Sequence, residues 1–322
     1  MKHMLHNFLE IFINDSTNFS LMKRTIIRQR ESYTITLPKK WVEDLGLKGG
    51  EDVAITKLDT RLIISSEHQS LQKAVRLNIT AMDRNAVIKT ITAYYENGYS
   101  EIAIHSKKKS IYDPWQEKEK PLSEEMEFIT GRLIGFEIIS SQKDVTIIKD
   151  VSATSPTEFN NILRRIFFLI LEYQNAVLEI ITTKNKLANN EQLHDNITKF
   201  SSFCLRLLNL NIDKSTIEKN NLYTIITLLD KIADTLRYLA RDYRTGNVEL
   251  IKRMMDHVRA YYDFFYKQDI QLVNYLDKER KELKAKIASS KNREIIAFSS
   301  VFEYIQALIK PTLCLMERSL VS

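Results

Sequence analysis

The 322-residue sequence predicts a multidomain α+β protein whose C-terminal half is all helix. Three observations predict this class. Gly and Pro are scarce, at 7 and 5 residues, which argues against a large all-β protein full of tight turns. Short apolar runs alternate with helical stretches up to about residue 151. From Thr157 to Lys310 there is no Pro, and apolar residues recur at spacings of three and four.

Charge and cysteine content narrow the class of protein further. The net charge of +6 permits a nucleic acid or an anionic surface as partner without requiring either. Two distant cysteines, Cys204 and Cys314, are too few for a disulfide framework, and their apolar surroundings predict buried thiols in a reducing cytosol. No run of 18 apolar residues occurs, so we predict a cytoplasmic protein without membrane insertion.

The first 21 residues predict a disordered lead before the first domain. Their apolar patch, 8–13, is interrupted by Glu10 and has no small-residue cleavage site after it, which argues against a signal peptide. A start at Met22 is the alternative interpretation of the same segment.

Residues 22–68 predict a small domain of short strands around one helix. Ile26-Ile27 and Tyr33–Leu37 alternate as strands, and Pro38 opens a helix over 39–45 that Gly46 closes. Residues 53–55 and 62–64 form a hairpin about Asp59-Thr60. Such a unit buries too little apolar area to fold alone, so we predict an interleaved homodimer.

The segments Arg30–Val42 (RESYTITLPKKWV) and Leu45–Val53 (LGLKGGEDV) resemble the AbrB-type (SpoVT-AbrB) swapped-hairpin family. The one departure is an extra residue in the turn Gly50-Glu51-Asp52, which lengthens the turn without breaking the fold. The resemblance implies a homodimer that binds double-stranded DNA.

Basic residues accompany this segment. Six cations stand between positions 23 and 41, against Glu31 alone. Such side chains bind phosphates, and a dimer doubles their number. The alternative is a solvated basic strand edge that limits aggregation. The predicted DNA-binding residues are Lys23, Arg24, Arg28, Arg30, Lys39 and Lys40.

Residues 71–151 predict an α/β linking domain with a right-handed crossover. The expected strands are 74–79, 101–105, 136–139 and 145–149, with helices over 83–97 and 124–133. Residues 107–121 carry two prolines and predict a polar loop, in which Lys107-Lys108-Lys109 is a solvated run rather than an anion site. Neither GxGxxG nor GxxxxGK[ST] occurs.

Residues 156–322 predict six amphipathic helices, opened by Ser155-Pro156 as cap and first-turn proline. Gly246-Asn247 divides them halfway, so two three-helix bundles, over about 157–245 and 247–318, are the economical arrangement. The expected helices are 157–185, 189–209, 219–243, 247–267, 269–289 and 293–318.

This architecture behind such an N-terminus resembles the PhoU family of phosphate-uptake regulators, whose archaeal members often carry an AbrB-type domain in front. The segments RLNI (76–79), YYENGYSEIAI (94–104) and GRLIGFEII (131–139) are also similar to those members. The resemblance implies a link to phosphate homeostasis, and a phosphate-transporter ATPase as a partner.

PhoU proteins bind iron or zinc clusters through pairs of acids four residues apart, which share one helix face. The resemblance therefore implies a divalent or iron/zinc metal at Asp230 with Asp234 and at Glu191 with Asp195, where His194 adds an imidazole. In the second bundle Lys281 follows Asp277 at four residues, so at most one cluster, in the first bundle, is expected. The alternative is an ion-pair face in which Asp234 meets Arg237.

No sequence motif supports catalysis. HExxH, GxSxG and zinc-spaced cysteine pairs are absent, so we predict no catalytic residues and no enzyme. His257 is expected at the surface or partly buried, Trp41 as a packing residue and Trp115 in a loop. The predicted function is a DNA-binding transcriptional regulator whose bundles sense a ligand or dock a partner. The alternative is a transporter adaptor that uses residues 22–68 only to dimerise.

Overall fold

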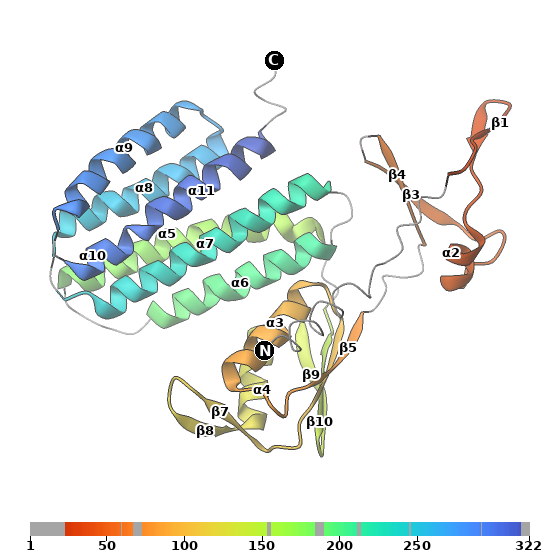
Figure 1. Cartoon of the computed structure of the whole chain (residues 1–322), viewed down its shortest axis with the longest axis horizontal. Coiled ribbons are helices and arrows are strands. Elements are labelled where there is room, and N and C mark those ends of the chain that lie inside the picture. Colours follow the sequence, from red (N-terminus) through yellow and green to blue (C-terminus); the bar gives the residue numbers. More distant parts are fainter. Residues whose placement is uncertain are drawn as a thin grey trace, which may run out of the picture. The chain divides into compact units, whose positions relative to one another are not determined.

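A computed structural model describes residues 23–58, 60–66, 73–152, 156–183, 190–210, 214–244, 246–290 and 292–316 (Figure 1). The chain divides into two compact units. Unit 1 carries strands β1 and β2, helix α2 and most of the β3–β4 hairpin, and unit 2 carries the elements from β5 onward. The predicted lead over 1–21 and the predicted cap Ser155 lie outside the described residues.

Unit 1 contains the predicted short strands around one short helix, and the strands pair as two hairpins. Strand β1 pairs antiparallel with β2, so that Arg28 lies opposite Tyr33, and Arg30 makes the turn with φ 50°. Gly46 closes α2 at φ 66°, where a side chain would be strained. The second strand ends at Thr34 rather than Leu37. The elements are β1 (Ile27–Gln29), β2 (Ser32–Thr34), α2 (Lys39–Asp44), β3 (Val53–Leu58) and β4 (Arg61–Ser66).

The described residues of unit 1 form no core of their own. None of its described side chains is buried, and the two hairpins form separate two-stranded sheets. A chain segment with so many open apolar side chains and unpaired strand edges needs a partner surface to stay folded. Its large hydrophobic side chains that stand exposed are Ile26, Ile27, Tyr33, Ile35, Ile55, Leu62 and Ile63.

Unit 2 begins with a four-stranded sheet in the order β5-β6-β10-β9. Strands β5 and β6 are parallel and joined by α3, which is the predicted crossover, while β10 is antiparallel to both of its neighbours. Asp83 caps α3 through the amide of Ala86, as expected from the sequence. The elements are β5 (Ala74–Asn78), α3 (Arg84–Glu96), β6 (Glu101–His105), β9 (Phe136–Gln142) and β10 (Val145–Asp150).

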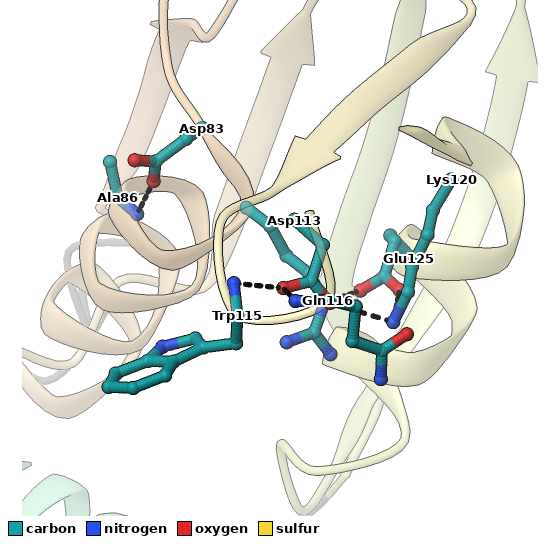
Figure 2. Close-up of polar contacts among 8 residues, drawn as sticks. Asp83, Ala86, Asp113, Trp115, Gln116, Lys120 and Glu125 are labelled. Carbon is teal, nitrogen blue, oxygen red and sulfur yellow. Dashed lines mark hydrogen bonds and ion pairs between the residues drawn. The ribbon is translucent and has the colours of Figure 1, made fainter. Parts of the chain in front are cut away.

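The loop predicted over 107–121 was wrong, because this segment forms a β-hairpin. Strand β7 (Ser110–Asp113) pairs antiparallel with β8 (Lys118–Pro121), and α4 (Leu122–Thr130) follows directly. Asp113 makes the difference, since its Oδ1 accepts the amides of Trp115 and Gln116 at 3.0 and 3.3 Å and so builds the turn (Figure 2).

Ion pairs hold this hairpin to the rest of unit 2. Arg84 Nε of α3 lies 3.7 Å from Asp113 Oδ2, and Lys120 Nζ lies 3.5 Å from Glu125 Oε1 of α4. Within the hairpin, Lys120 Nζ also lies 2.9 Å from Asp113 Oδ2. Asp113 and Glu125 are both buried. The bond from Lys120, together with the two turn amides, holds the pKa of Asp113 below its usual value. Partners this far apart in the chain leave no local signal, which is why the sequence favoured a loop.

The rest of unit 2 is helical, and the predicted helices are confirmed except at the last one. That helix is broken at Ser299 into α10 and α11, because the Ser299 hydroxyl bonds back to the carbonyl of Ile296. A 3-10 turn (Pro156–Glu158) precedes the first helix. The helices are α5 (Phe159–Thr183), α6 (Asn190–Leu210), α7 (Thr216–Asp242), α8 (Val248–Lys267), α9 (Gln271–Ala288), α10 (Arg293–Phe298) and α11 (Ser300–Leu315).

The helices pack in two contiguous groups (Figure 1). Helices α5, α6 and α7 contact one another, while α8 contacts α9 and α11. The groups join where α11 lies against α7 and where Gln174 of α5 donates to the carbonyl of Met255 at 3.2 Å. Within the second group Tyr261 and Thr312 share a buried hydrogen bond of 2.8 Å. The structure thus has the predicted mixed α+β class with a C-terminal helical region.

Helix α5 is long and apolar enough to cross a membrane, judged by length and composition alone. The core helix of a globular protein passes the same test. Its buried residues include Ile166, Ile170 and Val177, and it contacts α6, α7 and α8. This packing accounts for its apolar character.

Burial of the cysteines and of His257 differs from expectation. Cys204 is buried, and burial raises the pKa of its thiol, but Cys314 is exposed rather than buried. His257 is 1% exposed, whereas a surface or partly buried position was predicted. Its ring meets Phe302 edge-on at 5.0 Å, and within the described part of the chain neither ring nitrogen has a hydrogen-bond partner. Burial lowers the pKa of His257 to about 4, with help from Arg280.

We expect His257 to make unit 2 less stable in acid. The unfolded chain binds a proton near the usual histidine pKa, whereas the folded chain resists it down to about 4. The contribution of His257 is therefore complete above pH 6.5 and is lost as the pH falls toward 4. Relative to His257→Leu, the wild-type free energy of unfolding should fall by about 3 kcal/mol from pH 7 to pH 4. Urea unfolding at the two pH values measures this, and identical pH profiles for the two proteins would contradict it. Phe302→Leu, which keeps the imidazole, serves as control.

Candidate nucleic-acid interface and predicted metal residues

The structure places all six predicted DNA-binding residues at the surface of unit 1. Lys23 and Arg24 precede β1, Arg28 lies within β1, and Arg30 forms the turn to β2. Exposure leaves each cation free to reach a phosphate oxygen. Lys39 and Lys40 form the first turn of α2.

Tyr33 was not among the predicted contact residues, although it shares a hairpin face with Arg28. The two are directly opposed in the β1–β2 register, so their side chains lie on the same side of the pleat. Tyr33 is 70% exposed. A tyrosine hydroxyl beside an arginine suits phosphate contacts on a duplex. Strand alternation, applied across the turn, was the signal that could have found it.

The ion pair between Lys39 and Glu43 does not remove Lys39 from this surface. The pair is 3.6 Å long, and its side chains are 89% and 61% exposed. Pairs of this kind contribute little to stability and are screened by salt. Lys39 can therefore exchange Glu43 for a phosphate at little cost.

The predicted metal residues lie on α6 and α7, and three of the four are paired with cations. Glu191 Oε2 lies 2.6 Å from Arg237, whereas the sequence alternative paired Arg237 with Asp234. Asp195 Oδ1 lies 3.1 Å from Arg132. Asp234 accepts from Lys231 at 2.7 Å.

His194 joins two of these acids across the helices. Its Nε2 lies 3.0 Å from Asp234 Oδ1, and its Nδ1 lies 3.7 Å from Asp195 Oδ1. Burial lowers the pKa of His194, but the two carboxylates outweigh burial and the pKa stands above its usual value. A protonated imidazole is the species that this geometry favours.

Asp230 differs from the other three acids. Its Oδ1 is buried without a hydrogen-bond partner among the described residues. Burial, and then the charge of Asp234, raise its pKa. Burial, and then the charge of Asp230, raise the pKa of Glu96 of α3. The long sequence separation of Glu96 and Asp230 gave no signal of this electrostatic effect.

The described residues include no group of three or more His, Cys, Asp or Glu side chains arranged to hold a metal ion. The four acids of α6 and α7 therefore remain a prediction as metal ligands. Each retains the chemistry for it, since carboxylates and imidazole are ligands for zinc and iron.

Comparison with known proteins identifies one segment. Residues 26–71 match the family described as antidote-toxin recognition MazE, bacterial antitoxin. No curated protein and no solved structure matches the chain. The match spans β1 to β4 and supports the predicted swapped-hairpin DNA-binding domain. Domains of this type typically dimerise and bind DNA, and they indicate DNA-binding or antitoxin-type regulation.

Proposed function

We propose that the chain is a homodimeric, cytoplasmic transcriptional regulator that binds double-stranded DNA through unit 1. One observation carries the proposal: the same segment presents six exposed cations and, among its described residues, no buried core. A second copy of unit 1 would cover the open apolar side chains, and it would double the cations.

The charge pattern supports contacts with the phosphate backbone. Among residues 23–41 only Glu31 opposes the six cations. Cations give affinity that depends steeply on salt, while base edges give sequence preference. Arg28 and Tyr33 on one hairpin face are the residues to which we assign the approach to a groove.

For the helical part of unit 2, we propose a PhoU-like module, not an enzyme, that senses a ligand or docks a partner linked to phosphate uptake. The segments 76–79, 94–104 and 131–139 support this proposal, together with two groups of packed helices. A phosphate-transporter ATPase is the proposed partner. A metal at Glu191, Asp195, Asp230 and Asp234 belongs to the same proposal.

DNA binding of the full-length protein to a pool of genomic fragments, repeated over a salt series, tests the regulator. With about six phosphates neutralised, the logarithm of the binding constant should fall against log salt with a slope near −5. We expect a subset of fragments to be enriched with that slope.

Charge reversal separates the regulator from the adaptor. The double variant Arg28→Glu, Lys39→Glu removes four cations from the dimer, so it should weaken DNA binding at least about tenfold and make the salt slope shallower by about three to four. Lys278→Glu, an exposed lysine of α9 in unit 2, should leave both unchanged. Equal, weak binding to all fragments by the wild type would contradict the regulator and favour a unit 1 that only dimerises.

A further inference from the structure

Unit 2 contains a groove of about 790 Å³ between its α/β part and its helices. One wall comes from α3, α4 and the β7–β8 hairpin, and the other from α6 and α7. Apolar Ile129 and Leu133 are among its lining residues. The volume is in the range of small-molecule sites, about 300–1,000 Å³.

Cations dominate the rim of this groove. Six basic side chains line it, against four acids. The acids paired with two of these arginines are exposed, since Asp195 opposite Arg132 is 46% exposed and Glu191 opposite Arg237 is 61% exposed. An incoming anion can replace such solvated carboxylates at little cost. The basic residues are Arg84, Lys89, Arg132, Lys199, Arg237 and Arg241.

Aromatic rings stand open beside these cations. Trp115 is 84% exposed, and its indole points away from the charged network of its own hairpin (Figure 2). The guanidinium groups of Arg84 and Arg132 lie 4.9 and 5.3 Å from the ring centre of Phe128. Tyr238, also on the groove, lies 5.1 Å from the guanidinium of Arg241.

The hairpin that presents Trp115 is fixed in place. The backbone amide of Trp115 donates to Asp113, which is 1% exposed and paired with Lys120. A buried ion pair of this kind often stabilises the fold no more than apolar residues of similar size would. When it is fully paired, it holds its side chains in one geometry. The backbone of Trp115 is therefore positioned beside the groove, so a ligand meets the open indole without rebuilding the hairpin.

We infer that this groove binds a nucleoside phosphate, with the base against Trp115 and the phosphates on Arg132 and Arg237. Aromatic faces stack on any base, and arginine forks match phosphate oxygens. An inorganic anion would use the arginines but not the ring. Binding of a nucleoside phosphate to this groove is independent of the proposed DNA binding, and it is tested without DNA.

Fluorescence tests the inference directly, since the chain has two tryptophans, Trp41 and Trp115. In full-length Trp41→Phe, excited at a wavelength that tyrosine does not absorb, only Trp115 emits. ATP and GTP should quench this emission with a Kd below about 1 mM, whereas inorganic phosphate should leave it unchanged. Titration calorimetry on the wild type, with the same three probes, guards against an effect of the Trp41 substitution on unit 1.

Variants assign the contacts. Arg132→Gln and Arg237→Gln should each raise the Kd for ATP about tenfold, and Trp115→Leu should reduce the affinity for ATP toward that for inorganic phosphate. Lys278→Gln on α9 should leave the Kd unchanged. The inference is overturned if calorimetry and fluorescence both detect no ATP or GTP binding at millimolar concentration. Equal affinity for ATP and inorganic phosphate, or wild-type affinity in both arginine variants, overturns it as well.

Discussion

Replacing Arg206 by Ala should lower the free energy of unfolding of unit 2 by about 3–5 kcal/mol. Arg206 is 3% exposed, and its Nη2 donates to Asp150 Oδ2 at 2.6 Å. Its Nη1 donates to the carbonyls of Tyr95 and Tyr99 at 2.8 and 2.7 Å. The guanidinium also lies 5.0 Å from the ring centres of Tyr95 and Phe136.

The cost is large because several groups lose their partner together. Arg206 belongs to α6, whereas its acceptors belong to α3, to the turn after it and to β10. Truncation leaves one carboxylate and two carbonyls without their bonds and opens a cavity between the two parts of unit 2. The side chain thus joins the sheet to the helices.

Chemical unfolding of a double-mutant cycle measures this effect. Arg206→Met keeps most of the volume, Asp150→Asn removes the facing charge, and the double variant should recover part of the summed loss. Arg241→Ala serves as matched control, because Arg241 is 61% exposed and pairs only with its neighbour Asp242 among the described residues. A loss below about 1 kcal/mol in Arg206→Ala would contradict the assignment.

The double variant Ile55→Asp, Leu62→Asp should convert the dimer to monomer and abolish specific DNA binding. In one chain these side chains are 62% and 66% exposed, and none of the described side chains of unit 1 is buried. Two carboxylates placed where a second copy would bury apolar surface carry a large desolvation cost. We expect DNA affinity to fall at least about a hundredfold, because one monomer presents only half of the cations.

Light scattering over a concentration series measures the mass, and DNA titration of the same samples measures the affinity. Ile270→Asp changes an exposed apolar residue of unit 2 in the same way, and it should remain dimeric and bind DNA. A double variant that stays dimeric at all concentrations would contradict a dimer through unit 1.

Features specified within a few residues could be predicted from the sequence. The helices of unit 2 follow from apolar spacing, and the cap Asp83 and the stop Gly46 follow from local backbone chemistry. The β7–β8 hairpin could not be predicted, because Asp113 finds Lys120 and Arg84 only in the folded chain. Its sequence is polar and contains Pro114 and Pro121, which is typical of a loop.

The candidate sites divide in the same way. Charge and exposure of the six cations could be predicted, since lysine and arginine rarely lie buried. Acid spacing placed Asp230 and Asp234 on one helix, and His194 was predicted to join the site with Glu191 and Asp195. The bond from His194 to Asp234 on the other helix and the electrostatic effect of Asp230 on Glu96 had no signal in the sequence. Burial of His257 could not be predicted either, because a lone histidine on a helix is compatible with both the surface and the core.

The apolar helix α5 is synthesised before a helix that covers it, so the order of synthesis affects how the new chain folds. It ends at Thr183, whereas α8, one of the helices that cover it, begins only at Val248. At roughly 5–20 residues per second, the ribosome takes several seconds to synthesise the chain from the end of α5 to the start of α8. During this interval α5, which is long and apolar enough to cross a membrane by composition, lacks one of the three helices that pack on it. A newly made chain therefore presents a transient binding site for chaperones, and slow translation between α5 and α8 should increase its aggregation.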